Sequence, residues 1–234
     1  PGRMSQKGAT VRFLGDPIIL IAPASTDHQQ IRQADIYICG NPWKCWVFLQ
    51  LLTGDGHEGV GECSLNGFAK TTVACIEELS RYFLGKRPED YATITARMLT
   101  DRYSDAGQVH RGVIAAVEMA CLDILGKRAG LSVVALLGGK VRDEIPAYTN
   151  GWYRTERTPE NFSKAAENAM GRGYSVVKFD PFGSHVSPLS SDSMQECLNI
   201  INEMELTANP GGLAAECHQR LDWLDAKAVL DYMM

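Results

Sequence analysis

Four ionisable side chains stand near the ends of two short strand-like segments in the second half of the chain. The first segment, Tyr174–Asp180, ends in Lys178-Phe179-Asp180, and the second, Leu213–His218, ends in Glu216-Cys217-His218. Residues two apart on a strand point to the same face, so each segment presents a pair of polar groups on one face and apolar residues on the other. A lysine, two carboxylates and an imidazole in one place can neutralise an anionic ligand, bind a hard cation and transfer a proton.

Each pair alone has an ordinary structural explanation. A Lys-x-Asp at a strand end is often a solvated terminus, and a lone Glu-x-His is often a surface pair. Placement on successive parallel strands favours function, because the carboxyl ends of such strands meet at the edge where α/β proteins bind ligands. Four ionisable groups at that edge need partners such as a metal ion or an anionic substrate.

The elements that position these groups alternate between strand and helix after Arg142. Short connections between alternating elements predict parallel strands crossed over by helices. Thr158 followed by Pro159 predicts a helix start, because threonine is a good N-cap and proline fits the first helical position. The expected elements are a strand at 145–150, a helix from 159 to about 170, strands at 174–180 and 213–218, a helix at 192–205 and a final helix from 225.

The first half of the chain predicts an α+β unit. Trp46–Thr53 and Val60–Cys63 indicate two strands of a hairpin around an Asp-Gly turn. Helices are expected at 70–83, 88–102 and 111–129, with a short helical segment at 131–137 before Gly138-Gly139. Residues 1–35 show little periodicity, and we make no prediction for them.

The hairpin contains a G-x-G-x-x-G pattern at Gly54, Gly56 and Gly59. A dinucleotide site needs a helix to open inside this motif, so that its N-terminal amides meet the pyrophosphate. Here a second strand follows the glycines, so the hairpin interpretation is favoured over nicotinamide binding.

Composition excludes several classes of protein. The 234 residues carry a net charge of -5, which provides no electrostatic footprint for nucleic acid or an anionic membrane. The longest apolar run near the start, Ile18–Ala22, is far shorter than the roughly 18 residues that a spanning helix needs. Seven scattered cysteines without a C-x-x-C pair favour a reduced, cytoplasmic compartment over a disulfide framework or zinc site.

Several ordered motifs resemble the mandelate racemase and muconate lactonizing branch of the enolase superfamily, from about residue 43 to the last residue. The motifs shared with that branch as a whole are 46–48 with 59–62, 115–124 with 126–127, and 136–143. Those that look like its sugar-acid dehydratases, such as the galactonate and gluconate enzymes, are Tyr148–Trp152, Val177–Gly183 and Glu216–Arg220.

The resemblance implies an α/β protein with an N-terminal α+β capping domain, residues 1–142, followed by an incomplete (β/α) TIM-type barrel, residues 143–234. It also implies a Mg²⁺-dependent dehydratase that removes the proton next to a carboxylate and stabilises the resulting enediolate. The partner would be a small-molecule sugar acid, and the complete enzyme a homo-oligomer.

The resemblance also assigns roles to individual residues. Glu216 matches the first metal ligand, His218 the acid that protonates the departing 3-hydroxyl, and Lys178 the lysine that opposes the substrate carboxylate. The capping loop around Glu62, Asn66 and Phe68 matches the part that closes over the substrate tail. The substrate-binding candidates are Glu62, Asn66, Asn150 and Trp152, and the catalytic candidates are Lys178, His218 and Asp180.

Two positions depart from the family pattern. Asp180 occupies the place where racemases of this branch carry a second lysine as base, which favours a dehydratase whose base lies on a later strand. Gln219 occupies a place where the dehydratases usually carry glycine, which puts the turn after His218 in doubt.

The chain is short for this fold. The 90 residues from Ile145 to Met234 provide about three strands, whereas a full barrel takes about 250 residues. The remaining metal carboxylates and the base would lie on further strands, and Mg²⁺ keeps its waters unless several donors replace them. We therefore expect the 234-residue chain to be inactive by itself.

Two alternatives to the dehydratase stay open. One is a non-catalytic, truncated or degenerate family member that acts as a folded module or an interaction partner. The other keeps the family but changes the reaction to epimerisation or racemisation, which requires bases on both faces of the substrate.

Overall fold

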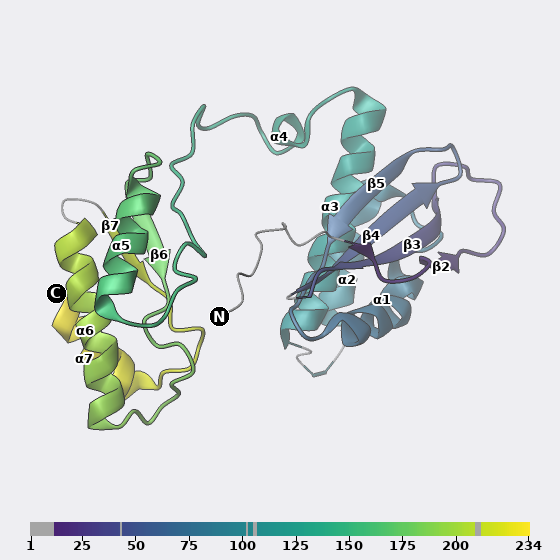
Figure 1. Ribbon diagram of the computed structural model, residues 1–234. Coiled ribbons are helices and arrows are strands. Elements are labelled where there is room, and N and C mark those ends of the chain that lie inside the picture. Colours follow the sequence, from purple (N-terminus) through teal and green to yellow (C-terminus); the bar gives the residue numbers. More distant parts are fainter. Residues whose placement is uncertain (1–11, 43, 102, 105–106, 209–211) are drawn as a thin grey trace. The chain divides into compact units, whose positions relative to one another are not determined.

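The computed structural model describes residues 12–42, 44–101, 103–104, 107–208 and 212–234 (Figure 1). The chain divides into two compact units, Pro1–Val141 and Arg142–Met234. Each unit has its own buried apolar core and is described by itself.

The first unit contains an antiparallel sheet of five strands. The long central pair is β3 (Ile31–Gly40) and β4 (Cys45–Thr53), and β5 (Glu58–Glu62) follows β4 in the predicted hairpin. Both β1 (Arg12–Phe13) and β2 (Ile18–Ile21) pair with β3. The strand that follows the three glycines confirms that they belong to a hairpin and not to a strand-to-helix phosphate loop.

β3 is absent from the elements predicted from sequence, because residues 1–35 carry no prediction and the first predicted strand begins at Trp46. An irregular register between Ile31 and Gln33 interrupts the alternation at the start of this strand. The later residues Ala34, Ile36 and Cys39 are buried, and the β-rich run from Ile36 to Cys39 was the available signal.

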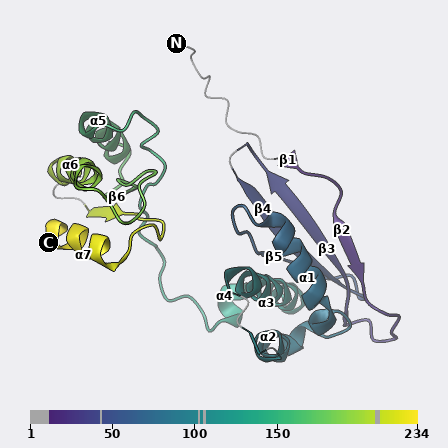
Figure 2. The ribbon, with the colours of Figure 1, turned by 90° about the horizontal axis from the view of Figure 1, so that it is seen from below.

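Helices cover one face of this sheet (Figure 2). They are α1 (Ala69–Phe83) and α3 (Gly107–Ala129). The unit also contains the 3-10 turn η1 (Pro88–Asp90), α2 (Tyr91–Thr100), which packs on α1 and α3, and the short α4 (Val133–Leu136), which follows α3. All the helices predicted in this half are present, with boundaries moved by a few residues. The core between helices and sheet includes Leu49, Leu51, Ile76, Leu79, Phe83, Val113, Val117 and Ile124, each with no exposed surface.

Glycines let β5 approach α3 closely. A Cβ placed on Gly61 would lie 2.0 Å from the carbonyl oxygen of Ala116, and one placed on Gly59 would lie 2.1 Å from that of Ala120. Alternate residues of a strand are about 6.8 Å apart and residues one helical turn apart about 6 Å, so the two glycines meet successive turns of α3. Any side chain on this face of β5 would push the helix away.

The second unit alternates helices and parallel strands. Its elements are α5 (Pro159–Met170), β6 (Val176–Phe179), α6 (Ser191–Ala208), β7 (Gly212–Ala215) and α7 (Trp223–Met233), and β6 pairs with β7 in parallel. Thr158 caps α5 and Pro159 occupies its first turn, as predicted. An antiparallel sheet with helices followed by parallel βα units confirms the predicted fold class.

Three predicted strands differ from the structure. The segment 145–150 makes only one isolated parallel bridge, from Thr149 to Val177, because its remaining residues are largely exposed and have no further ladder. The predicted strand 213–218 ends at Ala215, since the backbone at His218 and Gln219 adopts positive φ. The strand predicted at 174–180 is shorter as well and ends at Phe179, one residue before Asp180.

Two further observations concern the cysteines and the helices. All seven cysteines of the chain are free thiols in the structure. Among the helices of the described residues, none is long and apolar enough to cross a membrane.

Candidate functional site

The parallel pairing of β6 and β7 brings Lys178 and Glu216 together. Phe179 at the end of β6 lies opposite Ala215 at the end of β7, and the backbone N–H of Glu216 donates to the carbonyl of Phe179 at 2.8 Å. The Lys178 ammonium nitrogen lies 2.6 Å from Glu216 Oε2. The two side chains are 24% and 29% exposed, so this ion pair sits at the edge of the sheet rather than in its core.

Each partner of this ion pair shifts the pKa of the other. Hydrogen bonding from Lys178 lowers the pKa of Glu216 below its ordinary value, and the backbone N–H of His218 adds to the effect. The hydrogen bond to Glu216 raises the pKa of Lys178 above its ordinary value. Both groups are therefore held in their charged forms at neutral pH.

Asp180 follows β6 in a tight turn and is nearly buried, with 13% of its side chain exposed. Its Oδ1 atom accepts hydrogen bonds from the backbone N–H groups of Phe182 and Gly183, both at 2.8 Å. Its Oδ2 atom lies 3.2 Å from Nδ1 of His218. The turn thus fixes one carboxylate oxygen and directs the other at the imidazole.

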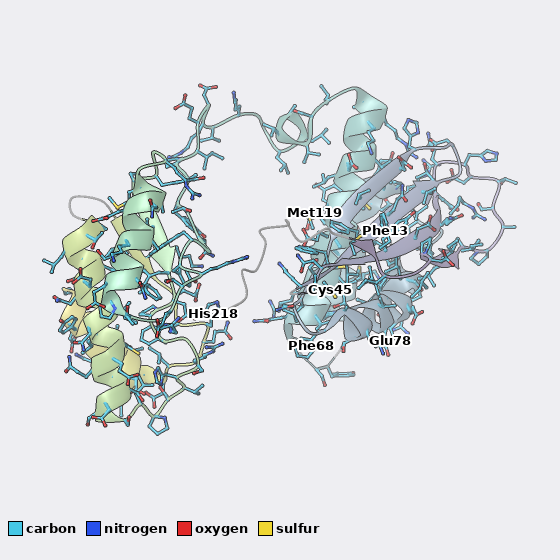
Figure 3. All side chains as sticks on the ribbon, viewed as in Figure 1. Phe13, Cys45, Phe68, Glu78, Met119 and His218 are labelled. Atoms are coloured by element: carbon cyan, nitrogen blue, oxygen red, sulfur yellow. The ribbon has the colours of Figure 1, made fainter. Side chains whose placement is uncertain are left out.

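His218 lies on the loop after β7 (Figure 3). Its backbone N–H donates to Glu216 Oε1 at 2.9 Å, so both oxygens of Glu216 are engaged. The backbone has φ of 49° at His218 and 58° at Gln219, a left-handed pair without glycine. Such residues cost of order 1–3 kcal/mol each and persist where surrounding contacts hold them, often at functional sites. The imidazole is 52% exposed and remains open to a ligand.

Asn150 and Trp152 flank the same edge of the parallel pair. The indole N–H of Trp152 donates to the backbone carbonyl of Lys178 at 2.8 Å, so it supports β6 directly. Asn150 is exposed, and its side-chain oxygen accepts from the backbone N–H of Gly151 at 2.8 Å. The indole N–H of Trp152 is therefore used within the chain. The side-chain amide nitrogen of Asn150 is the group that can bind a ligand.

Two residues that touch this site are not among the candidates predicted from sequence. The ring of Tyr148 lies 5.9 Å from the Lys178 ammonium nitrogen, in cation–π range. Arg157 donates to the backbone carbonyl of Asp180 at 2.7 Å and lies over the ring of Phe162. The position of Tyr148, an aromatic residue just before the turn at Asn150, could have indicated its contact with Lys178. Nothing in the sequence around Arg157 indicated its contact with Asp180.

The two other candidates, Glu62 and Asn66, belong to the first unit. Glu62 is exposed at the end of β5, and Asn66 is exposed in the loop that leads to α1. Asn66 lines a surface pocket together with Lys44 and Lys70. Phe68, half exposed, directly precedes α1 (Figure 3). The pocket beside Asn66 therefore carries two lysines, and Glu62 does not line it.

The described residues do not fit a complete magnesium site. Among them no three His, Cys, Asp or Glu side chains are grouped as metal ligands. At this edge Asp180 is held by backbone N–H groups of its turn, and Glu216 is paired with Lys178 and accepts from the backbone N–H of His218. Mg²⁺ demands six oxygen ligands in near-octahedral geometry, so one carboxylate cannot replace enough of its waters.

Comparison with known families and curated proteins gives consistent matches. Residues 34–138 match the family described as mandelate racemase / muconate lactonizing enzyme, N-terminal domain. The D-gluconate/D-galactonate dehydratase of Picrophilus torridus is 30% identical over 206 residues, which cover 82% of this chain and 51% of that protein. The D-galactonate dehydratase of Pectobacterium atrosepticum is 36% identical over 115 residues, 49% of this chain and 30% of that protein.

Solved structures resemble the fold as well. The mandelate racemase/muconate lactonizing enzyme-like protein of Roseovarius sp. TM1035 superposes with a TM-score of 0.75 at 26% identity, over 87% of this chain and 57% of that one. The chain spans about half the length, or less, of the curated relatives that it matches.

Proposed function

We propose that this chain, which belongs to the mandelate racemase/muconate lactonizing enzyme branch of the enolase superfamily, forms part of a dehydratase that acts on a sugar acid. The names of the curated relatives support D-gluconate or D-galactonate as the kind of substrate. The observation that carries the proposal is the cluster of Lys178, Glu216, His218 and Asp180 at the carboxyl ends of β6 and β7.

Dehydration of an aldonate removes a proton from C2 and hydroxide from C3, and the enol that results becomes a 2-keto-3-deoxy acid. Lys178 suits the first requirement, because its ammonium can oppose the charge that builds on the substrate carboxylate as the C2 proton leaves. His218 suits the second, because an exposed imidazole can protonate the departing 3-hydroxyl, so that the C3–O bond breaks with water as the product. We assign the base that takes the C2 proton to no described residue.

We also propose that the reaction depends on Mg²⁺. In the family Mg²⁺ supplies electrostatic stabilisation of the enediolate, and Glu216 would contribute one carboxylate oxygen to it. The described residues contain no group of three or more possible metal ligands. The remaining ligands would therefore come from other residues. The 234-residue chain by itself is therefore proposed to be inactive.

The test uses protein expressed from the complete reading frame that contains these residues. We expect formation of 2-keto-3-deoxy acid from one or more aldonates of a panel that includes D-gluconate and D-galactonate, and loss of product on addition of a chelator. Glu216→Gln and Lys178→Met should each abolish turnover. Glu167→Gln and Lys164→Met, which change exposed residues of α5 to the same types, should leave it unaltered. Absence of product from every aldonate would exclude the proposed activity.

A non-catalytic role is the second candidate, and one observation favours it. Both oxygens of Glu216 are engaged within the chain, by Lys178 and by the backbone of His218, so the residue proposed as a metal ligand is already satisfied. Calorimetric titration of the 234-residue chain with Mg²⁺ tests this candidate. Binding at millimolar concentration or tighter would contradict a chain that cannot bind metal by itself.

A further inference from the structure

We infer that Arg157 is a positioning residue: its guanidinium holds the turn that follows β6 and so sets the place of the Asp180 carboxylate beside His218. The inference rests on the proposed function for its consequence in turnover. The contacts on which it depends lie within the second unit and can be tested in a chain without activity.

Arg157 contacts the turn at its first residue. Its Nη2 atom donates to the backbone carbonyl of Asp180 at 2.7 Å. The preceding carbonyl, that of Phe179, accepts from the backbone N–H of Glu216 and belongs to the pairing of β6 with β7. Hydrogen bonds from a charged donor are roughly twice as strong as neutral ones. The guanidinium therefore fixes the main chain one residue beyond the end of the sheet.

Arg157 also packs against the last residue of the turn. A Cβ placed on Gly183 would lie 2.8 Å from both Cζ and Nε of Arg157. Gly183 has φ of 59°, a conformation that glycine adopts without strain. The guanidinium thus occupies the space that a side chain at this position would fill, and it touches the turn at both ends.

The guanidinium is itself held from below. Its Cζ atom lies 5.3 Å from the centroid of the Phe162 ring, in cation–π range. Phe162 is fully buried in α5, and Thr158, the N-cap of that helix, directly follows Arg157. A planar guanidinium can stack on an aromatic face and donate in its own plane, whereas the ammonium of lysine cannot. The start of α5 and the turn after β6 are therefore joined through one planar group.

The position of the turn decides the position of the Asp180 carboxylate. Its Oδ1 atom accepts from the backbone N–H groups of Phe182 and Gly183, and its Oδ2 atom lies 3.2 Å from Nδ1 of His218. A proton donor has to stay within hydrogen-bond reach of the group that it protonates, and a displacement of about 1 Å can cost on the order of 100-fold in rate. Loss of Arg157 should therefore affect turnover more than substrate binding.

Amide hydrogen exchange in the 234-residue chain, followed by NMR, tests the hold on the turn. Arg157→Met removes the donor and the charge, so the Phe182 and Gly183 amides should exchange roughly 10-fold faster or more, because local opening becomes easier. The matched control is Arg172→Met, since Arg172 is exposed beyond the end of α5 and precedes β6. This control should leave both amides unchanged.

Two results of this experiment overturn the inference. One is equal exchange of both amides in the wild type and in a folded Arg157→Met protein. The other is exchange of these amides in the wild type at the rate of an unstructured peptide, which decides the matter even if the variant does not fold.

A double-mutant cycle tests the packing against Gly183. Gly183→Ala in the wild type meets both the guanidinium and the unfavourable φ, whereas in an Arg157→Ala background only the φ remains. The loss of stability in urea from Gly183→Ala should therefore be smaller in the Arg157→Ala background, since residues in contact are not additive. Equal losses in the two backgrounds would refute the contact.

Activity tests the consequence in the complete, active protein. Arg157→Met should lower kcat by on the order of 10- to 100-fold and leave KM within about twofold, the pattern of an interaction that matters in the transition state. Arg157→Lys should share this loss, because it keeps the charge but not the planar group. An unaltered kcat in Arg157→Met, or full activity in Arg157→Lys, refutes the positioning role. Absence of dehydratase activity in the wild type refutes the proposed function instead, and the exchange result stands independently of it.

Discussion

We expect that substitution of Gly61 by alanine destabilises the first unit more than a substitution of similar size at an exposed position. The added Cβ would lie 2.0 Å from the carbonyl oxygen of Ala116 and 2.7 Å from its carbonyl carbon. Real Cβ atoms essentially never approach other atoms closer than 3.0 Å, so α3 and β5 must separate by about 1 Å. The obstacle is helix backbone and cannot rotate away as a side chain would.

The magnitude follows from the cost of overpacking. Extra methyl groups in well-packed cores cost about 1–3 kcal/mol, and contact with backbone places this case at or above the upper value. Gly61→Ala should therefore lower the free energy of unfolding by about 3 kcal/mol or more. Displacement of β5 would also shift the loop that carries Glu62 and Asn66, which starts at the end of that strand.

Urea denaturation of the full chain, followed by circular dichroism, measures this effect, and amide hydrogen exchange of α1 and α3 assigns it to the first unit. The matched control is Val60→Ala, because Val60 is on the same strand but 44% exposed on the opposite face. The control should cost less than about 1 kcal/mol. A Gly61→Ala protein within about 0.5 kcal/mol of the wild type would refute the close packing of β5 on α3, since surface substitutions typically produce changes of that size.

Three further predictions concern the second unit. The pKa of Glu216 is lowered in the folded protein, so its pairing with Lys178 stabilises the fold at pH values above the ordinary glutamate pKa of about 4.3. This contribution disappears as the pH falls through the lowered pKa of the folded protein. The raised pKa of Lys178 keeps the lysine side of the pair charged until the pH exceeds its ordinary value of about 10.4. The stability difference between wild type and Glu216→Gln in urea should thus shrink from pH 6 toward pH 3, and a constant difference would contradict the pairing. Gln219→Gly should raise the unfolding free energy by about 0.5–1 kcal/mol, because φ is 58° there and glycine adopts it without strain; a loss of stability would argue against that backbone conformation. Thr158→Ala should cost about 1 kcal/mol through loss of the cap to the Asn161 N–H, and thermal unfolding with no change in midpoint would exclude the cap.

Local sequence patterns predicted the structure correctly where the residues of a single element determine it. The β4–β5 hairpin, the start of α5 at Thr158 and the alternation that buries Val177 and Phe179 all followed from turn chemistry, capping and strand periodicity. The meeting of Lys178 with Glu216 also followed, because parallel strands align their carboxyl ends and a period of two selects the shared face.

Predictions were wrong or incomplete where the chain leaves regular structure. The alternation that placed His218 on the same face as Glu216 does not apply, since β7 ends at Ala215 and His218 adopts positive φ. The expected strand at 145–150 keeps only the bridge at Thr149. In each case the backbone conformation is decided by contacts with other elements, which a local pattern does not contain.

The sequence by itself thus determined the family resemblance, the order of the elements and the two residues that face each other from neighbouring strands. Only the tertiary structure decided that Asp180 holds a turn with one oxygen and faces the ring of His218 with the other. The physical reason is that periodicity specifies which face a strand residue takes, whereas the direction of a side chain in a turn depends on the backbone amides that happen to surround it.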